Sequence, residues 1–66
     1  MNIFVNGKPH ESVPETSITD LVSALGLSGK RIAVEVNEEI IPKSAHTTTV
    51  IREADKVEIV HAIGGG

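Results

Sequence analysis

The chain has 66 residues, of which 39% are hydrophobic and 23% charged, and its formal net charge is −3 at pH 7. This balance is typical of one small globular domain and excludes a disordered chain. Cysteine is absent, which excludes disulfides and thiolate metal sites. An acidic chain whose one aromatic residue is Phe4 also lacks the basic surface and the stacking platform of a nucleic-acid binder.

The sequence carries no signal for a membrane or for export. No stretch approaches the roughly 20 apolar residues that cross a bilayer, and residues 1–6 lack the basic and apolar regions of a signal peptide. We therefore expect a cytoplasmic protein in which residues 1–66 form a single domain.

The first elements predicted are two strands joined by a tight turn. Residues 1–6 alternate with period 2, which is typical of a strand. Asn6-Gly7 supplies two residues that tolerate positive φ, as a type I′ hairpin turn requires, so the chain is expected to return over residues 8–13. The prolines in and just after that segment cannot donate to a β-ladder, which makes the second strand an edge strand.

One helix follows the hairpin. Its apolar residues have helical spacing and form a single stripe: Ile18, Leu21, Val22 and Leu25. Ser17 and Asp20 are placed to form a capping box at its start. Gly26 ends the helix, with Leu27 expected to fold back over the last turn. A helix of about nine residues does not persist alone, so it must pack on a sheet.

The second half of the chain predicts three further extended segments. Residues 32–36 alternate as a strand, and a tight turn at 37–38 leads to a short strand at 39–41 that Pro42 ends. Residues 43–49 are expected to be a loop with one helical turn, 50–51 a brief extended piece and 53–56 a turn. The final strand, 57–63, is strongly apolar, which predicts burial on both faces and a central position beside the first strand. The predicted class is α+β, with one helix packed across a mixed sheet of roughly four to five strands.

The final strand passes directly into three glycines. Ala62-Ile63 adjoins Gly64 without any polar residue between them. A flexible glycine tail, residues 64–66, has no Cβ and can pass through a slot too narrow for a side chain, delivering the carboxylate of Gly66. A solvated chain end or a cloning remnant would also be rich in small residues. The abrupt junction favours the first interpretation.

The sequence resembles the ubiquitin-like β-grasp proteins and, among them, the ThiS family of sulfur carriers in thiamine thiazole biosynthesis. Three segments carry the resemblance: IFVNG at 3–7, AVEVNEEIIP at 33–42 and DKVEIVHAIGGG at 55–66. The last of these is the specific one. The helix and the 43–49 loop carry no recognisable signature.

The resemblance implies a carrier rather than an enzyme. An adenylyltransferase, ThiF, would use ATP to convert the Gly66 carboxylate to an acyl adenylate, with Gly64 and Gly65 threading its active site. A sulfur-supplying enzyme would convert the adenylate to a thiocarboxylate, and thiazole synthase, ThiG, would take the sulfur. The chain itself would bind no cofactor and no metal. The residues agree in one respect, because a chain without cysteine has no thiol side chain on which to carry sulfur.

A docking patch for partners is expected on the sheet face away from the helix. If alternate apolar residues of the strands face the helix, the opposite face carries an exposed set: Phe4, Val60 and Ala62, joined by Ile41. The alternative is that Phe4 belongs to the core and the faces of the first strand are reversed.

Other functions find less support in the residues. His10, His46 and His61 lack metal-ligand spacing, and no Gly-x-Ser-x-Gly nucleophile motif occurs. Two other types of β-grasp protein share a glycine tail: the small subunit of molybdopterin synthase and modifiers that are conjugated to lysine. A plain interaction domain is a third possibility. Exchange of oxygen for sulfur at the terminus would mark a carrier, and a lysine adduct would mark a modifier.

Overall fold

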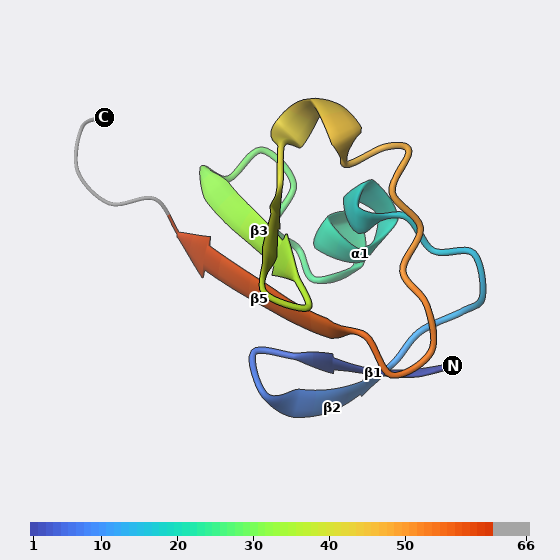
Figure 1. Ribbon diagram of the computed structural model, residues 1–66. Coiled ribbons are helices and arrows are strands. Elements are labelled where there is room, and N and C mark those ends of the chain that lie inside the picture. The colour runs from blue at the N-terminus through green and yellow to red at the C-terminus, as the bar shows by residue number, and fades with distance from the viewer. Residues whose placement is uncertain (62–66) are drawn as a thin grey trace.

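The computed structural model describes residues 1–61 of the chain. One helix lies across one face of a five-stranded sheet with strand order β2-β1-β5-β3-β4 (Figure 1). The elements in chain order are β1 (Asn2–Val5), β2 (Lys8–Glu11), α1 (Ile18–Ala24), β3 (Ile32–Val36), β4 (Glu39–Ile41), a 3₁₀ turn η1 (Lys43–Ala45) and β5 (Lys56–His61). The predicted α+β class is confirmed.

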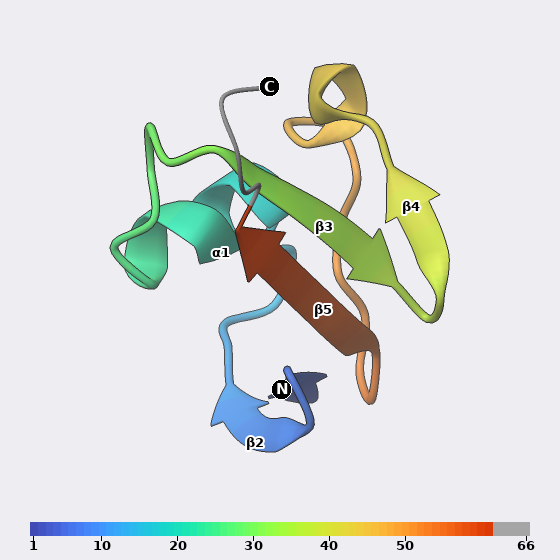
Figure 2. The same ribbon diagram turned by 90° about the vertical axis from the view of Figure 1, so that its left-hand side faces the viewer.

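Strand β5 lies at the centre of the sheet, as predicted. It pairs in parallel with β1 and antiparallel with β3, so the sheet is mixed. Figure 2 shows α1 behind β3 and β5, with no other labelled element in front of these strands. We call this uncovered side of the sheet the open face.

The prediction that β5 is buried on both faces was wrong. Its residues alternate between buried and exposed, with Val57 and Ile59 in the core and Glu58 and Val60 exposed. The strand is central because β1 and β3 pair with its two edges. The helix α1 covers only one of its two faces. Residues 62–63 of the predicted strand lie outside the described residues.

The first hairpin turn follows its sequence signal. Asn6 and Gly7 have φ values of 52° and 80°, both positive as a type I′ turn requires. Strand β2 ends at Glu11, earlier than residue 13, although the Ser12 N–H still donates to the Met1 carbonyl over 2.8 Å. Beyond Ser12 the chain leads to α1, with Glu15 at a φ of 63°.

Both ends of α1 are fixed by local hydrogen bonds. At the start, the Asp20 N–H donates to Ser17 Oγ over 3.0 Å and the Ser17 N–H donates to Asp20 Oδ2 over 3.2 Å, which is the predicted capping box. At the end, Leu27 N–H donates to the Val22 carbonyl and Gly26, at a φ of 75°, donates to Ser23. This is a Schellman motif. The helix has 7 residues, fewer than predicted.

The core lies between α1 and the sheet. Its buried apolar residues are Ile3, Ile18, Leu21, Val34, Ile51, Val57 and Ile59. Full burial of one such side chain contributes about 1.5–3 kcal/mol. Ile51 comes from a loop, and its N–H donates to the Thr16 carbonyl over 2.8 Å, which holds the loop beside the start of α1.

Candidate functional site

The strand that leads to the glycine tail is held from both sides. Strand β3 pairs with β5 as far as His61, opposite Ile32. On the other side β1 ends earlier, and the side chain of Asn6 continues the contact, since its Oδ1 accepts a hydrogen bond of 2.7 Å from the Ile59 N–H. The body of the domain thus anchors β5 up to the last residue that the structure describes.

Part of the predicted site lies outside the described residues. Gly64, Gly65 and Gly66, the tail and proposed attachment point, belong to this part, and so does Ala62 of the docking patch. Their roles stay predictions.

The structure places two patch residues on the open face. The Phe4 side chain is 37% exposed and that of Val60 is 56% exposed, whereas Ile3 beside Phe4 is fully buried. The alternative in which Phe4 fills the core is therefore wrong. Whether a partner contacts these side chains stays a prediction.

Ile41 does not lie on the open face, contrary to the prediction. It pairs with Val34 and packs against the core. The two-residue turn after β3 sets Val36 opposite Glu39, so that Ile40 shares the open face with Glu35. Ile40 is 70% exposed and was missed. Counting cross-strand pairs outward from the turn would have found it.

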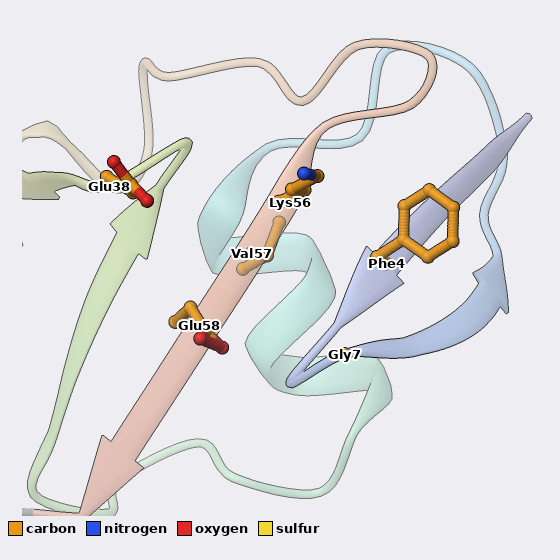
Figure 3. Close-up of a pocket in the computed structure, with 6 residues that line it drawn as sticks. All are labelled: Phe4, Gly7, Glu38, Lys56, Val57 and Glu58. Atoms are coloured by element: carbon orange, nitrogen blue, oxygen red, sulfur yellow. The ribbon is translucent and has the colours of Figure 1, made fainter.

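The open face contains a hollow of about 310 Å³, lined by Phe4, Gly7, Glu38, Lys56, Val57 and Glu58. Figure 3 shows how three elements form it. Phe4 on β1 stands at one side, Glu38 in the β3–β4 turn stands at the other, and β5 runs between them. The hollow therefore joins two hairpins that are distant in sequence through the strand that precedes the tail.

The described residues offer little for other kinds of site. Within residues 1–61, no group of three or more His, Cys, Asp or Glu side chains could hold a metal ion. His46 Nε2 lies 3.0 Å from the Ile41 carbonyl oxygen, to which it can donate, so this ring supports the end of β4. Among the described helices, none has the length and hydrophobicity to span a membrane.

Comparisons with known proteins agree with the fold and the tail. The model of the ThiS family matches residues 3–66. A sulfur carrier protein ThiS from Bacillus subtilis is 38% identical over 63 residues, 94% of this chain and 96% of that protein. A thiazole synthase from Magnetococcus marinus is 36% identical over 66 residues, which cover 100% of this chain but only 20% of the synthase.

A solved structure extends the likeness to three dimensions. The crystal structure of a thiamine biosynthesis protein, ThiS, from Geobacter metallireducens has a TM-score of 0.88 to this chain at 35% identity, covering 100% of both chains. Sequence and fold lead to the same conclusion: the chain belongs to the ThiS family of ubiquitin-like β-grasp proteins.

Proposed function

We propose that the chain carries sulfur for thiazole formation in thiamine biosynthesis, as a thiocarboxylate on Gly66. The observation that carries this proposal is the family match, which extends through the three glycines in a chain that has no cysteine. With no thiol side chain available, the backbone terminus is the group that can hold the sulfur. The name of the relative from Bacillus subtilis, a sulfur carrier protein, supports the same function.

The proposed chemistry has two steps on the terminal carboxylate. An oxygen of the Gly66 carboxylate attacks the α-phosphorus of ATP in a ThiF adenylyltransferase, pyrophosphate leaves, and an acyl adenylate forms. A sulfide-level sulfur from a sulfur-supplying enzyme then attacks the carbonyl carbon and AMP leaves, which gives the thiocarboxylate. The thiazole synthase ThiG takes the sulfur from there. This partner is supported by the likeness of the whole chain to a segment that makes up 20% of a thiazole synthase.

The body of the domain would serve this chemistry by positioning the tail. Adenylation needs the carboxylate at near-attack distance from the α-phosphorus, so the strand before the tail must be oriented firmly. Strand β5 meets that need because β3 and Asn6 hold it on either side. The exposed side chains of Phe4, Val60 and Ile40 on the open face would contact the partner, together with Ala62.

A reconstituted reaction tests the proposal. The chain ending at Gly66 is incubated with ThiF, ATP and sulfide, and its intact mass is measured. We expect replacement of one terminal oxygen by sulfur, and no change when ATP is omitted or Gly66 is deleted. A lysine-linked adduct in place of the sulfur exchange would indicate a modifier. Rescue of a strain that lacks the small subunit of molybdopterin synthase, without rescue of one that lacks ThiS, would indicate the other carrier.

A further inference from the structure

The hollow on the open face has features that the positioning of the tail does not require. Its floor is the backbone of β5, since the side chain of Val57 is buried in the core on the other face of the sheet and Gly7 adds no side chain. The exposed ring of Phe4 forms one wall (Figure 3). A hollow with an exposed aromatic wall on a sheet face is suited to receive a side chain from a docking protein.

The charges around the hollow indicate which side chain that would be. Glu38 and Glu58 line it, with Lys56 as the single cation among the lining residues. Glu35 adds a third carboxylate, because it lies directly opposite Glu58 in the β3–β5 register. Like charges that face each other across two strands repel. In Figure 3 the side chains of Lys56 and Glu58 lie apart along β5. The surface thus has an excess of negative charge that a cationic group would complement.

The two hairpin turns differ at their second position, where one has glycine and the other has Glu38. Each turn begins with asparagine, Asn6 at a φ of 52° and Asn37 at 51°. The second position is Gly7 at 80° in one turn and Glu38 at 71° in the other. Glycine is strongly preferred in this left-handed conformation and glutamate is strained there. The second turn departs from the preferred sequence, and the residue that it has instead of glycine places a carboxylate at the rim of the hollow.

We propose that the hollow receives an arginine side chain from the adenylyltransferase that activates the tail. A guanidinium is planar, so it can stack on the ring of Phe4 while donating to the carboxylates of Glu38 and Glu58. Its charge would also offset the repulsion between Glu35 and Glu58. This inference rests on the proposed function, because it takes the activating enzyme as the protein that docks on the open face.

The test is the Kd between the chain and a ThiF adenylyltransferase, measured by calorimetry. Replacing Glu58 by Gln, or Glu38 by Gly, should weaken binding about tenfold, because each removes a charge-assisted hydrogen bond. Phe4→Leu keeps an apolar side chain without the ring and should also weaken binding. Glu39→Gln is the matched charge control: this residue does not line the hollow, and its substitution should leave Kd unchanged.

Glu38→Gly gives the sharpest result, since it should weaken binding while raising the Tm by about 4 °C through relief of strain. Ala54→Gly, at another positive φ of 70° away from the hollow, should not lower the Tm and should leave Kd unchanged. Replacing the contacting arginine of the enzyme by lysine should weaken binding to the original chain more than binding to the Glu38→Gly chain, since the second chain has already lost one of the contacts. Normal adenylation with an unchanged Kd in the Glu38 and Glu58 variants would overturn this inference alone. A chain that is never adenylated would contradict the proposed function as well.

Discussion

Asn6 and Asn37 fasten the two hairpin turns to β5 from opposite sides. Asn6 Oδ1 accepts from the Ile59 N–H, and Asn37 Oδ1 accepts from the Lys56 N–H over 3.0 Å. The two turns could be predicted from the sequence, because asparagine tolerates the positive φ that such turns require. The sequence does not reveal these side-chain bonds, because they join residues that only the folded sheet brings together. At this scale two side-chain amides add to the backbone ladders that hold the tail-bearing strand.

Replacing Asn6 by Gly should lower the free energy of unfolding by about 1 kcal/mol, because it keeps the turn but leaves the partly buried Ile59 N–H without its acceptor. Urea denaturation measures the change. Asn6→Asp retains an oxygen acceptor and should stay closer to the original stability. A glycine variant as stable as the parent chain would show that this hydrogen bond contributes nothing.

The terminal glycines are predicted to matter for chemistry and not for folding. Gly65→Ala or Gly66→Ala adds a Cβ that should collide with the walls of the partner's active site, and a small misplacement of the reacting group lowers the rate by about 100-fold. We expect an unchanged Tm and a loss of adenylation of at least that order, measured by ATP–pyrophosphate exchange. Adenylation of both variants at the normal rate would show that no narrow slot receives the tail.

The elements were predictable where a local pattern defines them. The alternation at 32–36 and the helix ends at Ser17 and Gly26 appear in the structure as expected. The errors involve contacts between elements. The apolar content of β5 did not reveal that one face is open, and the face of Ile41 depends on the register that the preceding turn sets. The burial of Ile51 depends on a loop meeting α1.

The capping box of α1 gives an element-scale prediction. Ser17→Ala should lower the free energy of unfolding by about 1 kcal/mol, because the first turn loses the acceptor for the Asp20 N–H. Ser23→Ala is the control in the same helix, at an exposed position. It should be neutral or slightly stabilising, since alanine favours the helix. The comparison uses urea denaturation of both variants, and equal stabilities would mean that packing alone fixes the start of α1.

At the scale of the whole molecule, one face of the sheet forms the core and the other face is exposed. Strand β5 lies between β1 and β3, with α1 and the core on one side and the open face on the other. The chemical proposal could be drawn from sequence because residues 55–66, which end in three glycines, carry the resemblance to the ThiS family. The hollow could not be predicted from sequence, since Gly7 and Glu38 line the same hollow only when both hairpins flank β5.

The central claim is that Gly66 bears the transferred sulfur. The most direct measurement is high-resolution mass spectrometry of the C-terminal peptide of the protein isolated from its own cells during thiamine starvation. We predict a fraction of molecules with sulfur in place of one carboxylate oxygen of Gly66, lost when the cells lack the adenylyltransferase. A terminus that carries only oxygen under these conditions, or a native chain that continues past Gly66 without being cleaved there, would contradict the claim.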